Sequence, residues 1–421
     1  MSTTFASLRE RDYRWFLTGQ AVTNVGTWMQ RIAQDWLVLQ VSGGNALALG
    51  ITTAMQFLPF VLLAPFAGVL ADRHSKRLLL TITGLVGGVA AGCLGLLVVA
   101  GDVEIGAIYA LAFVLGAASA IDNPTRQALL GEIVSRATLP NAVALNSTVF
   151  NMSRLLGPAL AGVLIAWVGT AVVFGLNAVS FVLAVATLPL LRPTPVPRLP
   201  GVAVTFRAGA RYVRSRPDVI FVLVAVGIMA TFAFNFAITT ALMATAEFNV
   251  GASAYGMMNT ALAVGSVTGS LLATRRASAR LWLVFAAGIA MGVAEVVAGL
   301  MPTYGWFLVM LPVCGVLAMT FSVTAMSYLQ TMSAPEQRGR VMGWYTLVFF
   351  GGNPVGGPVL GLLATAFGPR WCLLGGGLTA AAALTAVALL AWRRGLLAAG
   401  PTPMGSAEQV GDHRPSLVQS R

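Results

Sequence analysis

Long apolar runs alternate with short polar or basic segments along the whole chain. A helix needs about 20 apolar residues to cross the hydrocarbon core of a membrane, and each run is close to that length or longer. We therefore predict twelve transmembrane helices, six on each side of a polar centre at 192–217. The predicted runs are 14–41, 45–71, 78–101, 105–125, 140–168, 172–191, 218–246, 254–274, 280–301, 304–330, 340–368 and 371–393.

Composition supports a membrane protein and excludes the soluble classes. The chain has 421 residues, of which 57% are hydrophobic and only 10% are charged, whereas about 25% of residues are charged in ordinary soluble domains. A globular core could not hide this much apolar surface from water, so a soluble enzyme, a disordered chain and a secreted domain are excluded. The predicted fold class is an all-α polytopic membrane protein.

The net charge of +12 would suggest nucleic acid if it were considered alone, but the basic residues flank the apolar runs. Of the 26 Lys and Arg residues, 23 lie in the N-terminal segment, the C-terminal tail, the centre and the loops that follow even-numbered runs. Cytoplasmic loops are enriched in this way. We expect both termini in the cytoplasm, membrane lipids as partners and no nucleic-acid partner. The Arg-, Ala- and Gly-rich composition suggests a bacterial cytoplasmic membrane.

The centre of the chain is proline-rich and then basic. Arg207, Arg211 and Arg214 recur at helical spacing, which predicts a short amphipathic helix on the inner leaflet; a simple linker is an equal alternative. The expected organisation is a cytoplasmic segment at 1–13, a six-helix bundle at 14–191, a linker at 192–217, a second six-helix bundle at 218–393 and a disordered cytoplasmic tail at 394–421.

The two halves resemble each other at an offset near 200 residues. Gly157-Pro158 in the fifth run corresponds to Gly357-Pro358 in the eleventh. Parallel six-helix repeats around a central pathway are typical of transporters, although repeats also occur in membrane proteins that transport nothing. We predict two pseudo-symmetric six-helix bundles.

One loop carries a recognisable signature. The segment from Gly68 through Asp72, Arg73 and Lys76 to Arg77 resembles the G-x-x-x-D-R-x-G-[RK]-[RK] loop of the major facilitator superfamily, with Ser75 at the second glycine. The resemblance implies the major facilitator fold and a conformational latch on the outward-open state. Asp72 and Lys76 can face one way on a helix, and we expect Asp122 to be a third member of the latch. The latch residues predicted from the sequence are Gly68, Asp72, Arg73, Lys76, Arg77, Asp122 and Arg126.

A second motif lies in the fifth run. Gly157, Pro158 and Gly162 resemble the core of the antiporter motif G-P-x-x-G-G of the same superfamily, and Gly357 and Pro358 repeat its first two residues. Small residues let helices approach closely, and proline permits a kink. The resemblance implies export, while glycine-rich packing without directional meaning is the alternative.

The N-terminal half resembles one branch of the superfamily almost continuously. Strings such as 26–30, Gly-Thr-Trp-Met-Gln, and 122–128, Asp-Asn-Pro-Thr-Arg-Gln-Ala, are similar to enterobactin-exporter-like and drug:proton antiporter carriers. This implies proton-driven export of a small amphipathic or anionic molecule such as a siderophore or a drug. An uptake symporter or a uniporter of the same fold is an alternative, and a non-transporting membrane sensor or assembly partner is a more distant one.

Charged residues inside the predicted helices mark a candidate site, because an intramembrane charge needs a partner or water. At 100° per residue, a polar stripe that includes Asn24, Trp28, Arg31 and Asp35 covers one face of the first helix. We expect this face to line a cavity, and Arg31 and Asp35 to be able to pair. Asp35 is the candidate proton-coupling group, with a permanent structural ion pair as the alternative.

Other helices add further candidates. Arg154 is a second intramembrane cation, and Asn151 lies one turn before it. Glu295 is a secondary candidate for proton coupling. The predicted substrate-binding residues are Asn24, Trp28, Arg31, Asn151, Arg154, Asn235 and Trp344, each of which has ordinary helix packing as its alternative.

The sequence contains no enzyme constellation. His74 and His413 lie in a loop and in the tail, and no phosphate-binding G-x-x-x-x-G-K-[ST] loop is present. We expect no enzymatic activity, no cofactor and no metal. The expected partners are a small-molecule substrate and protons, and we expect a monomer.

Overall fold

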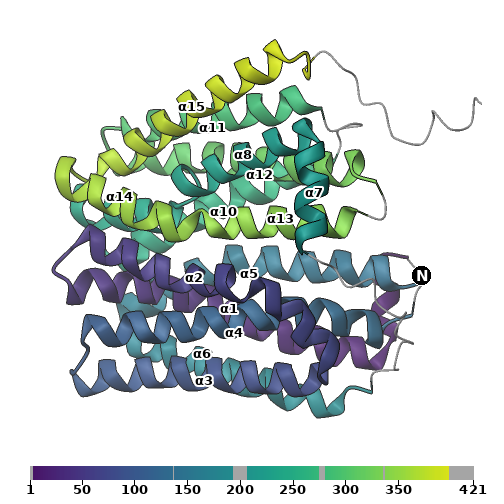
Figure 1. Cartoon of the computed structure of the whole chain (residues 1–421). Helices are drawn as coiled ribbons and strands as arrows, with labels where there is room; N and C mark the ends of the chain where they lie inside the picture. The colour runs from purple at the N-terminus through teal and green to yellow at the C-terminus, as the bar shows by residue number, and fades with distance from the viewer. Residues whose placement is uncertain (1–2, 136, 193–205, 275–279, 335–336, 398–421) are drawn as a thin grey trace, which may run out of the picture.

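The chain forms two stacked groups of helices in a computed structural model that describes residues 3–135, 137–192, 206–274, 280–334 and 337–397. The described residues contain helices but no strands. Helices α1 to α6 lie in the lower half of Figure 1 and α8 to α15 in the upper half. The N-terminal helices are α1 (Arg11–Val41), α2 (Ala46–Arg73), α3 (Lys76–Ala100), α4 (Ile105–Ile133), α5 (Leu139–Val168) and α6 (Thr170–Thr187).

The C-terminal half has more helices because two of its membrane-crossing segments are interrupted. α8, α9 and a π-helical turn at Met243–Glu247 form one crossing segment, and α13 and α14 form another. The C-terminal helices are α8 (Pro217–Phe232), α9 (Phe236–Leu242), α10 (Ala252–Thr274), α11 (Leu281–Gly299), α12 (Tyr304–Met332), α13 (Arg338–Gly351), α14 (Asn353–Phe367) and α15 (Arg370–Arg393).

The predicted fold class is confirmed. Ten helical segments of the described residues are long and apolar enough to span a membrane, and α1 and α10 complete two sets of six. Within each half, helices distant in sequence pack together, such as α1 with α6 and α11 with α15. The continuous runs predicted at 218–246 and 340–368 were wrong in detail. Asn235 precedes α9 in a non-helical conformation, and Gly352 with Pro354 separates α13 from α14.

A short helix, α7 (Phe206–Ser215), follows the N-terminal half along the chain and lies beside the upper group of helices in Figure 1. Tyr212 of α7 accepts a hydrogen bond from the backbone N–H of Ala334, 3.2 Å away, so α7 is attached to the C-terminal half. The preceding residues, 193–205, and the tail from 398 onward lie outside the described residues. The expected contact of this segment with lipid therefore stays a prediction, as do the disordered tail and the proposed domain boundaries.

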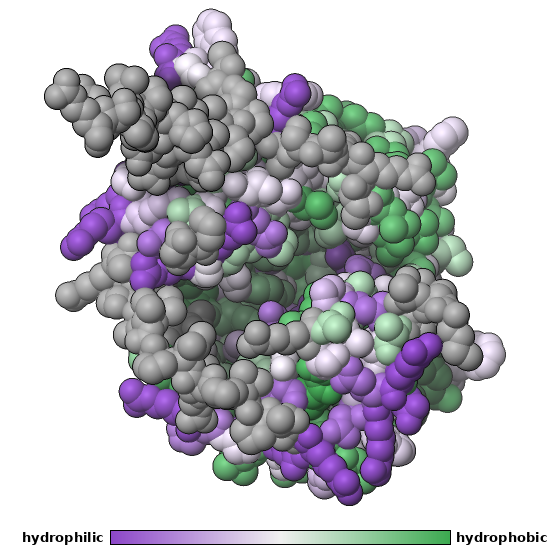
Figure 2. Space-filling view, turned by 90° about the vertical axis from the view of Figure 1, so that its right-hand side faces the viewer, coloured by the Kyte–Doolittle hydropathy of each residue, from purple (hydrophilic) through white to green (hydrophobic). Residues whose placement is uncertain are grey.

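The two halves meet at one end of the molecule. We call the end that carries the α2–α3, α4–α5 and α12–α13 loops the basic end, at the right of Figure 1, and the other the opposite end. Near the opposite end, α2 packs against α14 and α5 against α10. A view onto the basic end shows a hollow between the two halves, with largely apolar visible walls (Figure 2). The molecule is therefore closed at the opposite end and open at the basic end.

Candidate functional site

Two arginines from different helices lie over the same indole ring. The Arg31 guanidinium lies 4.8 Å from the Trp28 ring centroid, and that of Arg154 lies 5.7 Å from it. Phe57 of α2 lies 5.7 Å from the Arg31 guanidinium, and Phe150 of α5 contacts Trp28 edge-on. Such contacts are electrostatically favourable for a cation over an aromatic face. We call Trp28, Arg31 and Arg154 the arginine–tryptophan cluster.

The packing of α1 explains why its polar stripe faces this cluster. Gly26 lies against Asn177 and Ser180 of α6, with no room for a Cβ atom, and Gln30 accepts a hydrogen bond from the Asn177 side chain. This side of α1 is therefore occupied by α6. The Trp28 side is turned toward α5, where Gly157 leaves space for the Trp28 Cβ.

The structure does not bring Arg31 and Asp35 into an ion pair. Within the described ranges neither Arg31 nor Arg154 forms an ion pair. Asp35 instead accepts a hydrogen bond from the Tyr255 hydroxyl of α10 at 3.1 Å. The reason is that α10 packs close enough to α1 to place a donor at the carboxylate, while the Arg31 side chain extends over the aromatic rings. The cluster consequently holds two cations that form no ion pair in the described structure, although Asp35 is close enough to Arg31 to interact with it electrostatically.

The predicted asparagines behave differently from one another. The side-chain nitrogen of Asn24 is buried without a hydrogen-bond partner among the described residues. Asn151 donates to the Ser147 carbonyl of its own helix at 2.8 Å. Asn235 lies at the break between α8 and α9, where it donates to the Thr231 carbonyl at 2.9 Å. Of the three, Asn24 retains an unused donor near the cluster.

Further aromatic side chains come from α2 and α13. Trp344, which was predicted to contact substrate, lies in α13 beside Gly209 of α7. Phe350, which was not singled out, stacks on Phe60 at 4.8 Å and on Phe57 at 6.0 Å. A chain of rings from α2 and α13 therefore continues from Arg31 toward the C-terminal half. The three-residue spacing of Phe57 and Phe60 places both rings on one face of α2, and this spacing could have predicted their shared contact with another ring.

Glu295 lies apart from the arginine–tryptophan cluster. Its side chain is 2% exposed and lies between α11 and α15, where a Cβ on Gly377 would be 3.0 Å from the Glu295 Cβ. One of its carboxyl oxygens is buried with no hydrogen-bond partner among the described residues. Glu295 is therefore buried between helices of the C-terminal half.

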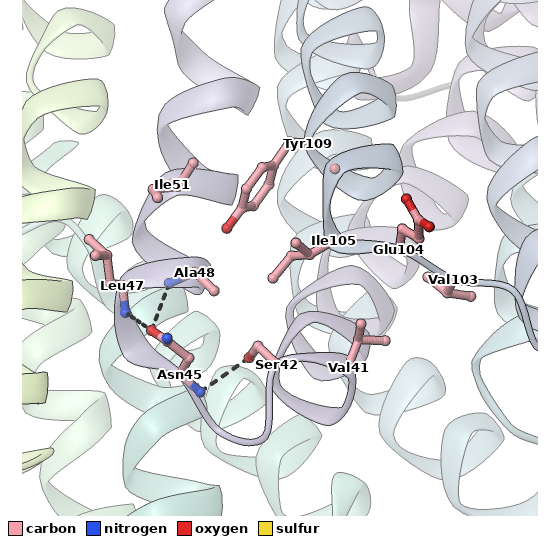
Figure 3. Close-up of a pocket in the computed structure, with 11 residues that line it drawn as sticks. Val41, Ser42, Asn45, Leu47, Ala48, Ile51, Val103, Glu104, Ile105 and Tyr109 are labelled. Carbon is pink, nitrogen blue, oxygen red and sulfur yellow. Dashed lines mark hydrogen bonds between the residues drawn. The ribbon is translucent and has the colours of Figure 1, made fainter.

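A separate cavity of about 620 Å³ opens at the opposite end, between the α1–α2 loop and the start of α4 (Figure 3). Asn45 lies on its wall, and its side-chain oxygen accepts hydrogen bonds from the backbone N–H groups of Leu47 and Ala48. The Asn45 backbone N–H donates to Ser42. These polar atoms cap α2, and the cavity contains none of the predicted site residues.

The model of a family described as "Transmembrane secretion effector" matches residues 2–408. The chain belongs to this family. The predicted resemblance to the major facilitator superfamily and its enterobactin-exporter-like branch is confirmed, because the relatives include an MFS-type transporter and enterobactin exporters.

Two relatives and one solved structure illustrate the similarity. The chain is 31% identical over 179 residues to the staphyloferrin A transporter of Staphylococcus aureus, a match that covers 42% of this chain and 45% of that protein. It is 29% identical over 311 residues to an enterobactin exporter of Citrobacter koseri, covering 72% and 73% of the two chains. The fold matches a bacterial homolog of the human lysosomal transporter Spinster with a TM-score of 0.73 at 14% identity, covering 91% and 97%.

The loop signature forms contacts that differ from those expected. Lys76 pairs with Glu132 of α4 at 2.5 Å. Asp122 pairs with Arg126 and accepts a hydrogen bond from Thr83 at 3.1 Å. The expected contact of Asp122 with Lys76 is therefore absent from the described structure, because each charge has a nearer partner.

Among the loop residues whose side chains the structure describes, none forms a further ion pair. The Asp72 side chain lies outside the described residues. Gly68 has open space around it, Arg73 is exposed, and the Nε atom of Arg77 is buried without a hydrogen-bond partner among the described residues. Whether these residues act as a latch stays a prediction. Glu132 was missed because nothing in its spacing separates it from an ordinary helix-terminal acid.

The antiporter-type motif lies where the halves touch. A Cβ on Gly256 of α10 would lie 2.6 Å from the Pro158 carbonyl oxygen and 2.9 Å from the Gly162 Cα. On the other side of the molecule, a Cβ on Gly357 would lie 2.6 Å from the Gly50 carbonyl oxygen, next to Pro358. We call these two contacts the glycine seams. Close approach of backbones is what small residues provide between membrane helices.

Proposed function

We propose that this protein is a secondary active transporter that exports a small amphipathic or anionic molecule in exchange for protons, by alternating access between its two halves. The observation that carries the proposal is the arginine–tryptophan cluster, where two cations that form no ion pair in the described structure lie among membrane-spanning helices. Intramembrane charges are costly and are retained where they bind ligands or ions. The staphyloferrin and enterobactin relatives support a siderophore-like or drug-like substrate.

In this proposal the basic end faces the cytoplasm of a bacterium, and both termini lie there. The excess of basic residues in the loops of that end supports the orientation. The hollow at the basic end then gives cytoplasmic substrate access to the site, and the glycine seams separate it from the outside. The protein acts as a monomer.

Individual roles follow from position and chemistry. Arg31 and Arg154 bind anionic groups of the substrate, and Trp28 contacts its apolar part. Asn24, Asn151, Asn235 and Trp344 are further substrate contacts. Asp35 is the proton-coupling group and Glu295 a second one. The resemblance of the loop implies that Gly68, Asp72, Arg73, Lys76, Arg77, Asp122 and Arg126 form the latch of the outward-open state.

Transport into proteoliposomes tests the proposal. The purified protein is reconstituted with a trapped pH indicator, and a panel of organic anions, cations and neutral solutes is added to vesicles of inside-out orientation. We expect an imposed pH gradient, acidic inside, to collapse faster with at least one amphipathic or anionic solute, and Asp35→Asn to abolish the effect. Solute movement in the same direction as protons would instead identify a symporter, and no proton movement with any solute would refute the proposal.

Orientation is tested separately in cells. A cysteine at Asp102, in the α3–α4 loop, is expected to react with a membrane-impermeant maleimide added outside, whereas a cysteine at Arg73 is not. Both positions are exposed. The reverse pattern would contradict the proposed orientation while leaving the transport assay interpretable.

A further inference from the structure

A hydrogen bond between Asp35 and Tyr255 joins the two halves near the closed end. The Tyr255 hydroxyl of α10 donates to the Asp35 carboxylate of α1 at 3.1 Å, across 220 positions of sequence. Both side chains are buried, at 0% and 3% exposed. The bond therefore connects the N-terminal bundle with the C-terminal bundle without competition from water.

The surroundings hold the tyrosine in place. Its ring stacks on Trp36 of α1, with centroids 6.1 Å apart and an interplanar angle of 22°. Its neighbour Gly256 lies against Gly162 in one glycine seam, and Ser253 donates to the Gly162 carbonyl at 3.2 Å. Because these contacts all cross between halves, separating the halves at this end must also remove the Tyr255 hydroxyl from Asp35.

Few ionisable groups face Asp35 besides Tyr255. Arg31 lies one turn away on α1, and Arg154 is the ionisable group within the α5 helix. Helices α6 and α9 carry no ionisable side chain. The remaining ionisable groups of packed helices lie toward the ends of α2 and α4; they are Asp72, Arg73, Tyr109, Asp122, Arg126 and Glu132. Asp35 accepts no second hydrogen bond within the described structure.

We propose that Tyr255 makes closure of the opposite end depend on the ionisation of Asp35. An ionised carboxylate accepts a hydrogen bond about twice as strongly as a neutral group, and an ionised carboxylate buried without a donor is costly. The closed end is therefore stabilised when Asp35 is ionised, and protonation of Asp35 favours opening. By reciprocity, closing the end favours release of the proton.

The role of this hydrogen bond in proton transport rests on the proposed function. A proton bound at Asp35 from the opposite side is released to the basic side, because the Tyr255 hydroxyl returns to the carboxyl when the halves close. The contact lowers the proton affinity of Asp35 in the state that is open to the basic end, whether the substrate moves with or against the proton. Tyr255 is thus a positioning residue for the coupling group.

Pulsed electron paramagnetic resonance on the full-length protein in lipid nanodiscs tests the inference without substrate. Cys93, Cys314 and Cys372, which are free thiols, are replaced by serine, and spin labels are placed at Asp102→Cys and Thr303→Cys, in loops of the two halves at the opposite end. We expect the ratio of long to short distances to rise about tenfold on acidification, as a charge-assisted hydrogen bond is weakened.

Variants separate the tyrosine from other causes. We expect Tyr255→Phe and Asp35→Asn to lose the pH response, with Asp35→Asn fixed near the acidic distribution of the parent. Tyr304→Phe is the matched control, because the Tyr304 hydroxyl bonds only to the Ala254 carbonyl of the same half, and it should retain the full response. A retained response in Tyr255→Phe, or a lost one in Tyr304→Phe, would overturn the inference.

The outcome is distinguishable from failure of the proposed function. The distance measurement needs no substrate, so an absence of proton-coupled transport in proteoliposomes would refute the function while leaving a Tyr255-dependent pH response intact. Conversely, Tyr255→Phe with an unchanged pH profile of transport and an unchanged distance response would overturn only the inference.

Discussion

Gly162 of α5 and Gly256 of α10 approach so closely that a Cβ on Gly162 would lie 3.0 Å from the Gly256 Cα. This contact and its counterpart between Gly50 and Gly357 place the helix backbones of the two halves directly against each other. Neither seam has space for a side chain larger than hydrogen. The closed opposite end therefore depends on the glycines, and the antiporter-type motif contributes Gly162 to it.

Adding bulk to a glycine seam should open the opposite end. We expect Gly256→Leu to destabilise the closed state by about 1–3 kcal/mol, the usual cost of overpacking. The reporter is a cysteine in place of Thr53, a buried residue beside Gly357, in a background without native cysteines. Its reaction with a maleimide should accelerate by about tenfold or more.

Gly305→Leu is the control for this experiment. A Cβ on Gly305 meets no atom within 4 Å, so the added side chain should leave the labelling rate unchanged. Equal rates for Gly256→Leu and Gly305→Leu would show that the seam does not hold the opposite end closed.

The order of the helices could be predicted from the sequence because apolar length alone determines which segments enter a bilayer. The runs at 45–71 and 140–168 agree with α2 and α5 to within two residues. The breaks within 218–246 and 340–368 were missed because hydropathy does not register a local change of hydrogen bonding. At Asn235 the side chain replaces backbone donors, and at Gly352 the close approach of Ala230 leaves no room for a side chain.

The candidate site was predictable where one helix determines it and not where two helices meet. The stripe on α1 followed from helical periodicity, and it placed Trp28 and Arg31 together. The partner of Asp35 depends on the rotation and depth of α10, which are set by packing at Gly256. Tyr255 carries no charge and lies at the start of an apolar run, where tyrosine commonly anchors a helix at the membrane interface. The sequence therefore offered no reason to predict it as a partner of Asp35.

Removing either arginine of the cluster should weaken binding of an anionic substrate. We expect Arg154→Gln and Arg31→Gln each to raise the KM for an anion identified in the proteoliposome panel by about tenfold or more, since hydrogen bonds to charged groups contribute about 1.5–3 kcal/mol. Arg154→Lys should lose less, because it retains the charge but not the planar fork. The measurement is the initial rate against anion concentration.

Solutes without negative charge provide the comparison for the arginine variants. If a neutral solute of the panel is transported, its KM should change less than that of the anion in Arg31→Gln. An equal loss for both would indicate that Arg31 supports packing around Trp28 rather than substrate charge.

The break between α8 and α9 should depend on the Asn235 side chain. Its amide donates to the Thr231 carbonyl at 2.9 Å and to the Ala230 carbonyl at 3.3 Å. Asn235→Leu deprives these buried carbonyls of a donor, so we expect a loss of about 1–3 kcal/mol and a lower melting temperature in detergent. Thr268→Val, which removes an exposed hydroxyl within α10, should leave it unchanged; an equal decrease would contradict the role of Asn235.

Arg370 lies at the opposite end of the molecule and should stabilise the C-terminal half there. This role accounts for a basic residue at an end where basic residues are otherwise rare. Its guanidinium donates to Glu247 at 2.7 Å and to the carbonyls of Gly299 and Met301 at 2.9 and 2.8 Å, so one side chain connects three segments. Lysine cannot match this planar geometry. We expect Arg370→Lys to cost about 1–2 kcal/mol, less than for a fully buried group because the site is partly exposed. The loss is measured by thermal unfolding in detergent. Arg393→Lys, an exposed change at the far end of α15, is the control and should leave the melting temperature unchanged. An unchanged melting temperature for Arg370→Lys would mean that water replaces these hydrogen bonds without loss of stability.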